Sequence, residues 1–227
     1  MQLLFSFGYQ HGIDSYACVR FNGQTSNRPI RDTICNIPYS SLKKQLIVLS
    51  APSGAGKTTI AREILARHPA DLMFSVSATT RSQRPQERDG IDYYFVTREK
   101  FEELITTDAL IEHEEIFGNY YGTPTSEIER ARQMGKRLLF DIDVKGGISI
   151  RNKFPDESLL LFIAPPDMHT LETRLRDRRT EPADIIQRRL DRAQMEMGMA
   201  GEYDHIIVND SLERAVTEVE KIIFERD

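Results

Sequence analysis

Eight residues near position 50 have the spacing of a phosphate-binding loop. The segment reads Ala51-Pro52-Ser53-Gly54-Ala55-Gly56-Lys57-Thr58. It matches the P-loop pattern G-x-x-x-x-G-K-[ST], with Ala51 in place of the first glycine. Backbone N–H groups of such a loop point at an anion, and glycines let the backbone approach it closely. Lys57 is then placed to reach the β- and γ-phosphates of a nucleoside triphosphate, and the Thr58 hydroxyl to ligate Mg²⁺.

The segments on either side of the loop favour this interpretation over an ordinary glycine-rich turn. An unbroken apolar run at residues 46–49 precedes the loop and predicts a buried strand. Residues 60–65 follow it with apolar side chains at helical spacing. A strand, a glycine loop and a helix therefore meet in the order that a phosphate site needs, and the helix adds the positive end of its dipole.

Two acids follow a second predicted strand. Residues 137–143 read as a buried strand with Asp141 and Asp143 at its carboxyl end. In an open parallel sheet, ligands bind at that end of the strands, and P-loop enzymes often use such an aspartate near Mg²⁺. The alternative is a pair of acids that simply faces solvent.

Arginines gather in two places. Arg81 and Arg84 lie three apart beside hydroxyl residues and Tyr93, and they could hold a second phosphate because guanidinium groups match phosphate oxygens. A solvated charged loop is the alternative. Two predicted helices, at 167–178 and 182–199, carry more arginines. These are Arg174, Arg176, Arg178, Arg179, Arg188, Arg189 and Arg192. Next to a triphosphate site in an acidic protein, they favour a phosphate-closing lid over a solvated face.

Composition limits the class of protein. The 227 residues are 40% hydrophobic and 29% charged, as expected for one soluble α/β domain with a small insertion or for two small domains. No apolar run reaches the ~20 residues of a membrane span. The net charge of -5 gives no support for nucleic-acid binding. The five histidines lack paired spacing, so a structural zinc site is not expected.

Residues 1–44 differ from the rest of the chain. They lack sustained periodicity and carry more basic than acidic residues. A secretory signal or a transit peptide is not expected, because a basic start, a long apolar core and an Arg- and Ser-rich composition are missing. We expect a disordered or mistranslated extension here, with a regulatory or packing role left open. Both cysteines, Cys18 and Cys35, lie in it, which fits a reducing cytosol and excludes a disulfide framework for the remainder.

The remaining pattern alternates strands and helices. Strands are predicted at 73–77, 158–164 and 205–208, and residues 110–123 mix strand-like residues with a glycine turn. Helices are predicted at 99–106 and 124–134, where Pro124 opens the second helix and Gly135 stops it. Asp210 and Glu213 predict a capping box for a last helix. That helix is expected to bury Leu212, Val216, Val219 and Ile223. We therefore predict an α/β fold, a P-loop NTPase core with a mainly parallel sheet flanked by helices.

Several motifs in one order resemble the guanylate kinase family. Besides the P-loop, they are Ser77-Ala78-Thr79-Thr80-Arg81 with Arg84-Pro85, Gly118-Asn119-Tyr120-Tyr121-Gly122-Thr123, Asp141-Ile142-Asp143 and Ile207-Val208-Asn209-Asp210. The resemblance covers residues 45–227. It implies transfer of the γ-phosphoryl group of MgATP to GMP, in a body made of a core, a GMP-binding α+β insertion at about 78–125 and a helical lid at about 170–195.

The resemblance also assigns residues. The GMP phosphate would be held by Ser77, Arg81, Arg84, Tyr93 and Tyr121. Glu112 falls at the position that reads guanine, with Thr123 as its hydroxyl partner. The alternative is that Glu112 is one exposed acid among several. Asp143 would lie between the base and the metal. The lid arginines that match are Arg174, Arg178 and Arg189, and Asn209 would lie near the adenine of ATP.

The sequence departs from the family pattern at three positions. Gln86 replaces a glycine in the turn after Arg84, and Arg179 replaces a glycine of the lid. Lys145 replaces the glutamine of the hydrophobic-Gln-Gly run that often follows the Asp-Ile-Asp segment. None of the three has a role in the predicted chemistry.

Two alternatives to a GMP kinase remain. One is a catalytically inactive guanylate-kinase-like scaffold that binds phosphopeptides, which the intact Gly56-Lys57-Thr58 disfavours. The other is a P-loop kinase of a different phosphorylated small molecule, which Glu112, Tyr121 and Thr123 disfavour. The expected partners are GMP, with dGMP as a second acceptor, and ATP with Mg²⁺. We expect a cytoplasmic protein that binds neither nucleic acid nor membrane, and the sequence does not decide between a monomer and a homo-oligomer.

Overall fold

A five-stranded parallel sheet forms the centre of the fold in the computed structural model, which describes residues 44–177 and 183–225. In spatial order its strands are β2 (Leu72–Phe74), β7 (Arg137–Asp141), β1 (Leu46–Ser50), β8 (Ser158–Ala164) and β9 (His205–Val208). All four neighbouring pairs are parallel. The mainly parallel α/β sheet predicted from the sequence is thus confirmed.

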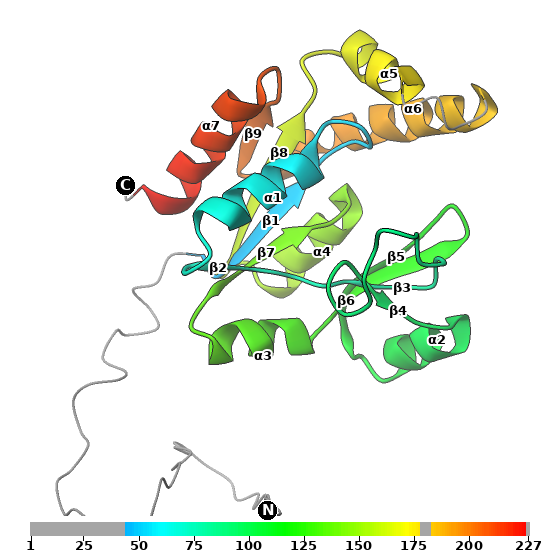
Figure 1. Cartoon of the computed structure of the whole chain (residues 1–227), viewed down its shortest axis with the longest axis vertical. Coiled ribbons are helices and arrows are strands. Elements are labelled where there is room, and N and C mark those ends of the chain that lie inside the picture. Colours follow the sequence, from blue (N-terminus) through cyan, green and yellow to red (C-terminus); the bar gives the residue numbers. More distant parts are fainter. Residues whose placement is uncertain (1–43, 178–182, 226–227) are drawn as a thin grey trace, which may run out of the picture. The chain divides into compact units, whose positions relative to one another are not determined.

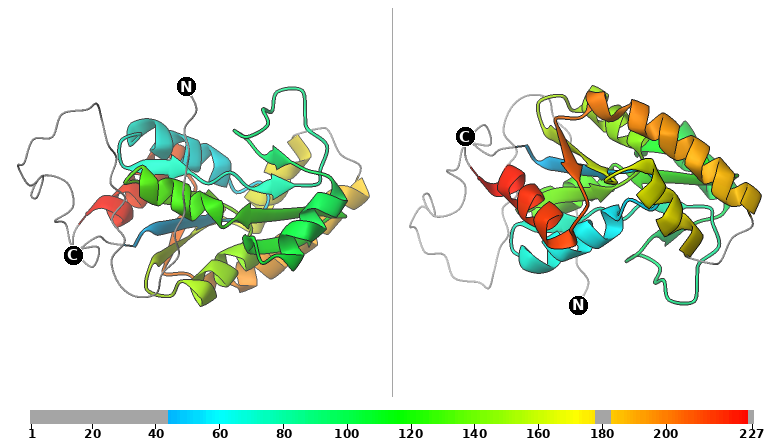
Figure 2. Two further views of the ribbon diagram at one scale, coloured as in Figure 1. Left: turned by 90° about the horizontal axis from the view of Figure 1, so that it is seen from below. Right: turned by 90° about the horizontal axis from the view of Figure 1, so that it is seen from above.

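Both faces of this sheet are buried, which explains why its strands read as unbroken apolar runs. Successive side chains of β1 point to opposite faces: Ile47 and Leu49 belong to one hydrophobic cluster, and Leu46 and Val48 belong to another. The first cluster includes side chains of α1 (Lys57–Arg67) and α7 (Leu212–Phe224), and the second those of α3 (Ser126–Gln133) and α4 (Val144–Lys153). Figures 1 and 2 show α1 and α7 together on one side of the strands.

A second, smaller sheet lies in the chain between β2 and β7. Its order is β4 (Tyr94–Phe95), β3 (Ala78–Thr79), β6 (Asn119–Pro124) and β5 (Leu110–Ile116), and α2 (Arg98–Thr106) packs on it through Phe101. Strands β5 and β6 form an antiparallel hairpin. Its two turn residues, Phe117 and Gly118, have φ of 50° and 80°, the left-handed values that tight hairpin turns require. We call residues 78–125 the insertion.

Two helices precede β9. They are α5 (Met168–Asp177) and α6 (Ala183–Gly198), and a short 3-10 helix, η2 (Ala200–Glu202), follows. Leu171 and Leu175 of α5 and Ile186 and Ala193 of α6 join the hydrophobic cluster on the α1 side of the sheet. The packing therefore holds both arginine-bearing helices near the P-loop end of the core.

Three local predictions were wrong. Pro124 is the last residue of β6, and α3 begins at Ser126; proline lacks the N–H that a ladder uses, so it is tolerated at a strand end. Asp210 does not form a capping box, because α7 has Ser211 at its N-cap without a side-chain bond and the Asp210 carboxylate pairs with Arg214. Leu212 is 42% exposed.

The buried stripe of α7 begins one turn later than predicted. The first buried residue of the helix is Ala215 and not Leu212, and Val216, Val219 and Ile223 are buried as predicted. The predicted stop of α3 at Gly135 is confirmed, since this glycine has φ of 63°. The strand predicted at 73–77 is shorter, and ends at Phe74.

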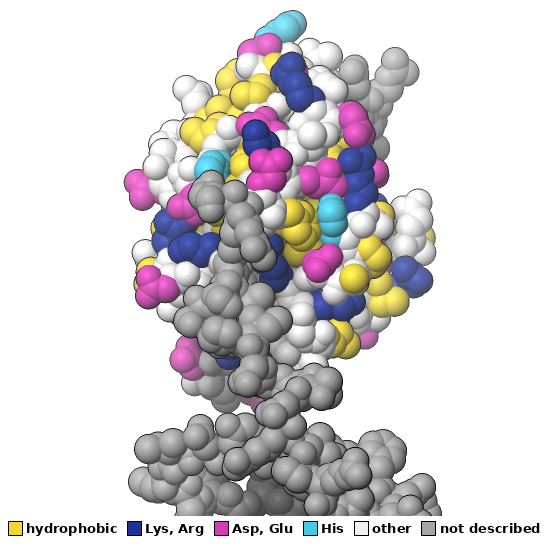
Figure 3. Space-filling view, turned by 90° about the vertical axis from the view of Figure 1, so that its left-hand side faces the viewer, with side chains coloured by type: hydrophobic (Ala, Val, Ile, Leu, Met, Phe, Trp, Pro, Cys, Tyr) yellow, Lys and Arg dark blue, Asp and Glu magenta, His cyan; other side chains and the backbone are white. Residues whose placement is uncertain are grey.

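On the face in Figure 3, acidic and basic side chains are interspersed. Across the described residues, no helix is both long and apolar enough to cross a bilayer. The extension predicted at 1–44, with Cys18 and Cys35, lies outside the described residues apart from Lys44.

Candidate functional site

The P-loop joins β1 to α1 and is held by backbone geometry that only glycine adopts easily. Gly54 and Gly56 have φ of 95° and 96°, in the left-handed region. A Cβ on Gly56 would lie 2.3 Å from the side-chain nitrogen of Asn209. That nitrogen donates a 2.7 Å hydrogen bond to the Ala55 carbonyl. Asn209, which the resemblance places near adenine, therefore also ties the loop to the segment after β9.

Lys57 points from the P-loop toward the carboxyl end of β7. Its Nζ lies 2.5 Å from an Asp141 carboxylate oxygen and donates to the Ile142 carbonyl at 2.7 Å. Asp143, next along the chain, caps α4 by accepting from the Gly146 N–H at 3.0 Å. The predicted meeting of the P-loop and the two acids at one sheet edge is therefore seen in the structure, and neither acid simply faces solvent.

A cavity of about 360 Å³ lies over the P-loop. The loop lines it, together with Tyr121 from the insertion, Asp143 from the core and Arg189 from α6. Thr58 also lines it, so its hydroxyl is available there. Within the described parts of the chain no group of three or more His, Cys, Asp and Glu residues could hold a metal ion. A single hydroxyl beside a phosphate cavity nevertheless fits Mg²⁺, which keeps several waters and relies on substrate phosphates.

A smaller cavity of about 160 Å³ brings together most of the residues predicted to hold GMP. These are Ser77, Tyr93, Glu112, Tyr121 and Asp143, and Lys57 and Asp141 line the same cavity. Lys57 and Asp143 are shared with the P-loop cavity. The two cavities therefore adjoin at the residue predicted to contact the transferred phosphate.

Glu112 is buried, not an exposed acid. It is 5% exposed, and the Thr123 hydroxyl donates to its carboxylate at 2.7 Å. The pairing follows from register, since Glu112 lies opposite Thr123 in the β5–β6 hairpin. Burial raises the pKa of Glu112 to about 7; the Thr123 bond opposes this rise and the nearby Asp143 charge adds to it. The carboxylate is thus costly to ionise unless a ligand compensates it.

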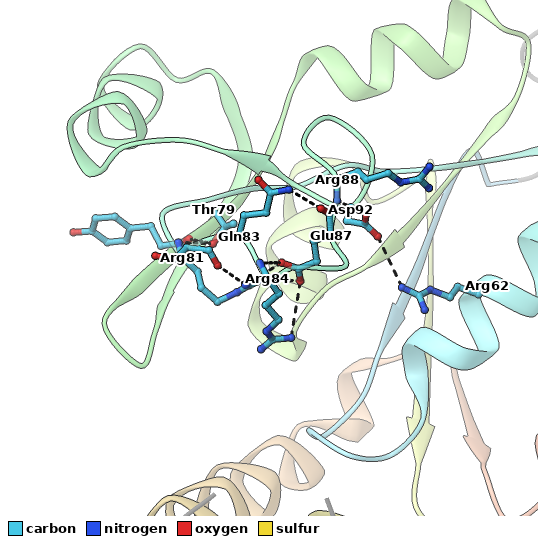
Figure 4. A network of polar contacts seen from close by, with 10 residues as sticks. Arg62, Thr79, Arg81, Gln83, Arg84, Glu87, Arg88 and Asp92 are labelled. Atoms are coloured by element: carbon cyan, nitrogen blue, oxygen red, sulfur yellow. Dashed lines mark hydrogen bonds and ion pairs between the residues drawn. The ribbon is translucent and has the colours of Figure 1, made fainter. Parts of the chain in front are cut away.

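Figure 4 shows the arginine loop and the acid that organises it. The Arg81 guanidinium donates to both oxygens of Glu87, at 2.8 and 3.1 Å. Glu87 also accepts from the Arg84 backbone N–H at 2.8 Å, and its hydrogen bond to Arg81 lowers the pKa of this carboxyl. The Arg81 guanidinium lies 5.4 Å from the centre of the Tyr93 ring, whereas the Arg84 side chain is 67% exposed.

Sequence reasoning missed Glu87 and its role in holding Arg81. The signal was present, because Glu87 comes three residues after Arg84 in a loop rich in basic residues. Arg84 lines a neighbouring cavity of about 380 Å³ together with Ser77, Tyr93 and Thr58. Both arginines therefore lie near the predicted phosphate end of the acceptor cavity, although only Arg81 is held tightly.

The predicted lid arginines differ in position. Arg174 on α5 donates to the Asn209 carbonyl at 3.1 Å, and Arg189 on α6 lines the P-loop cavity. Arg178 and the departure Arg179 lie outside the described residues. Arg192, predicted only as one of several lid arginines, lines the P-loop cavity, and its bond to Glu114 of the insertion at 3.0 Å was not predicted.

A buried acid that follows the insertion in sequence was also missed. Glu127 on α3 is 1% exposed and accepts from the Val76 N–H at 2.8 Å. Tyr94 donates to it at 3.2 Å, and Arg130 at 2.5 Å. A charge surrounded by three donors fixes the chain where it leaves β2 for the insertion.

Comparisons with known proteins agree on one family. The family model described as guanylate kinase matches residues 43–226. A guanylate kinase of Chlorobium chlorochromatii is 52% identical over 179 residues, 79% of this chain and 94% of the relative. A guanylate kinase of Chlorobium luteolum is 49% identical over 175 residues, which cover 77% of this chain and 88% of the relative. The crystal structure of guanylate kinase from Anaplasma phagocytophilum matches with a TM-score of 0.65 at 33% identity, covering 80% of this chain and 85% of that one.

Proposed function

This chain belongs to the guanylate kinase family, and we propose that it transfers the γ-phosphoryl group of ATP to GMP, giving ADP and GDP. The ATP phosphates would lie in the P-loop cavity and GMP in the adjoining smaller cavity. The observation that carries this proposal is the buried Glu112, which accepts from the Thr123 hydroxyl and lines one cavity with Lys57. A base-reading group and a phosphate-binding group thus lie within one acceptor site.

Glu112 supports guanine as the base. An ionised carboxylate can accept from both N1–H and the 2-amino group of guanine, whereas adenine presents an acceptor at N1 and has no 2-amino group. Adenine would leave the buried carboxylate unpaired, and such a mismatch costs roughly a thousandfold or more in selectivity. Thr123 supplies the hydroxyl that orients this carboxylate. Asp143 lies close enough to raise the pKa of Glu112 and completes the polar wall of the pocket.

The GMP phosphate is assigned to the far end of the same cavity. Ser77, Tyr93 and Tyr121 line it, and Arg81 lies against the Tyr93 ring. Hydroxyl groups and a guanidinium supply the donors that phosphate oxygens need. Arg84, with an exposed side chain, is assigned to the same phosphate once the loop closes on it.

Transfer needs no covalent nucleophile on the protein, because it relies on holding donor and acceptor in line while cations neutralise the developing charge. We assign that neutralisation to Lys57 together with Arg174, Arg178 and Arg189, and the holding of the ATP phosphates to the P-loop backbone. Mg²⁺, held by the Thr58 hydroxyl and phosphate oxygens, would supply further positive charge. We assign α5 and α6 to a lid that excludes water and limits ATP hydrolysis.

The test is a coupled assay of ADP formation with MgATP, comparing GMP with dGMP, AMP, CMP, UMP and no acceptor. We expect turnover that depends on guanine nucleotides and is lost in Lys57→Ala but not in the control Lys100→Ala, whose exposed side chain pairs with Glu103. Equal turnover without an acceptor would refute GMP kinase activity and indicate an ATPase. Tight binding of GMP or a phosphopeptide without turnover would indicate a scaffold. A cytosolic location, which the absence of cysteine from residues 45–227 supports, would be tested by fractionating cells.

A further inference from the structure

A polar network joins three parts of the chain that are far apart in sequence. Arg192 on α6 donates to a Glu114 carboxylate oxygen on β5 at 3.0 Å. Lys145, in the first turn of α4, lies 3.5 Å from the other oxygen of Glu114. The Glu114 and Arg192 side chains are 13% and 19% exposed, so this pair is more protected from solvent than an ordinary surface ion pair.

Glu114 lies on the strand that carries the base-reading residue. It is two positions after Glu112, so both side chains point to the same face of β5. It also lies opposite Tyr121 in the β5–β6 register, and Tyr121 lines both cavities. A movement of the hairpin that follows GMP binding would therefore move the Glu114 carboxylate as well.

Arg192 lies on the helix that carries a predicted catalytic arginine. It comes three positions after Arg189, so the two side chains lie on one side of α6, and both line the P-loop cavity. Glu196, one turn further on, accepts from Arg192 at 2.8 Å. The guanidinium is thus held from its own helix by Glu196 and from the insertion by Glu114.

We propose that Glu114 and Arg192 are positioning residues that couple the two substrate sites, so that GMP bound to the insertion places α6, and with it Arg189, over the ATP phosphates. This rests on the proposed function. The ion pair is the mechanical link: it connects the strand beneath the base to the helix above the P-loop. Neither residue touches the reacting atoms.

The groups around the pair act on the Glu114 carboxylate in opposite directions. Burial and the neighbouring Asp143 raise the pKa of Glu114 to about 7, while Arg192 opposes the rise. Lys145 adds a second positive charge beside the same carboxylate.

The coupling is measured by titrating a non-hydrolysable ATP analogue with Mg²⁺ into the full chain, with and without saturating GMP. The ratio of the two Kd values is the coupling factor, and allosteric factors are typically about 5–150-fold. We expect at least about fivefold tightening by GMP in the unaltered protein. Glu114→Gln and Arg192→Gln should each reduce the factor to near 1, and the double variant should reduce it no further.

Matched controls separate coupling from loss of charge or of folding. Glu115→Gln removes an acid from the opposite, exposed face of the same strand, and Arg188→Gln removes an arginine from an exposed position of α6; both should retain the coupling. Arg192→Lys should retain part of it, because lysine keeps the charge but not the fork that reaches both Glu114 and Glu196. Binding of the analogue without GMP should stay within about twofold of the unaltered protein in Glu114→Gln, Glu115→Gln and Arg188→Gln, which reports an intact P-loop.

Three results would overturn the inference: no tightening by GMP in the unaltered protein, an unchanged factor in both single variants, or additive losses in the double variant. If Arg192→Gln does not fold, an unchanged factor in Arg192→Lys and in Glu114→Gln overturns it equally. The coupled assay distinguishes this from failure of the proposed function. An unaltered protein that turns over GMP but shows no coupling contradicts the inference alone, whereas one that does not turn over GMP contradicts the proposed function.

Discussion

Thr123→Val tests whether the buried hydroxyl tunes the guanine-reading carboxylate. The Thr123 hydroxyl donates to Glu112 at 2.7 Å inside a fully buried environment, and valine keeps the shape of the side chain without the donor. Burial holds the pKa of Glu112 at about 7 in spite of this bond. Since the bond favours the ionised form, its loss must move the pKa further up.

The size of the shift follows from the strength of the bond. A hydrogen bond to a charged group contributes about 1.5–3 kcal/mol, and one pKa unit corresponds to about 1.36 kcal/mol. The pKa of Glu112 should therefore rise by about 1–2 units, to about 8–9. At pH 7 the ionised fraction would fall from about one half to between a tenth and a hundredth, so kcat/KM for GMP should fall by about 5- to 50-fold.

The assay is kcat/KM for GMP measured from pH 5.5 to 9. In the unaltered protein we expect the rate to rise with pH through an apparent pKa near 7, because only ionised Glu112 accepts both guanine donors. In Thr123→Val the same rise should occur 1–2 units later. The second ionisation of the GMP phosphate, with a pKa near 6, is common to both proteins and cancels in the comparison. Any difference that remains at the highest pH measures a direct contact of the hydroxyl with the base.

Thr125→Val is the matched control, because the Thr125 hydroxyl donates to the Ala109 carbonyl and not to Glu112. Its profile should coincide with that of the unaltered protein. A Thr123→Val profile with reduced height but an unshifted midpoint would refute the reasoning. It would mean that the hydroxyl acts only on the substrate and that Glu112 does not titrate in this range.

Three further predictions concern the pocket and the core. Glu112→Gln should raise the melting temperature relative to the unaltered protein, by an amount that grows between pH 5 and 8. The pKa of Glu112 in the folded protein lies above its usual value of 4.5, so ionising this buried acid costs stability as the pH rises. A difference in melting temperature that stays constant with pH would contradict this. Gly146→Ala should raise KM for GMP about tenfold or more in steady-state kinetics, because its Cβ would lie 2.8 Å from a Glu112 oxygen; an unchanged KM would show that the carboxylate moves freely. Phe140→Ala should destabilise the core by about 3–5 kcal/mol and lower the melting temperature by roughly 6–20 °C in calorimetry, and a loss below ~1 kcal/mol would show that the cavity collapses.

The parts of the site that were predictable from sequence have determinants close together in the chain. The P-loop needs one strand, one glycine loop and one helix in succession, so its residues specify it locally. The Glu112–Thr123 pair, which was assigned through the family resemblance, depends on a hairpin whose turn lies at Phe117 and Gly118. In both cases, short-range geometry places side chains that are close in sequence.

The residues that were missed owe their position to distant partners. Arg192 looked like one of several helical arginines, and nothing within α6 indicates that Glu114 would meet it. Glu127 is buried where the chain leaving β2 presents the Val76 N–H to it. A sequence gives the charge of such residues but not the surface against which they pack.

Local rules also failed where two of them competed. The spacing of Asp210 and Glu213 fits a capping box, but Arg214 lies one turn from Asp210 and pairs with its carboxylate. Leu212 matched the apolar stripe by spacing and yet begins the helix at the surface. Alternative capping arrangements at a helix end differ in free energy by only about 1 kcal/mol. A nearby opposite charge can reverse such a preference.

The position of β1 in the sheet has a consequence for how the chain folds during synthesis. β1 is the first described strand, yet it lies in the middle of the sheet, where Leu46 pairs with Leu138 on one side and Ser158 on the other. Because the ribosome adds about 5–20 residues per second, the apolar residues of β1 remain unpaired for several seconds before either partner strand has been synthesised. The β5–β6 hairpin, whose strands are adjacent in sequence, can pair much earlier. An exposed apolar strand during that interval is open to aggregation, so we expect slow translation or a bound chaperone to affect the yield of this protein more than its final stability.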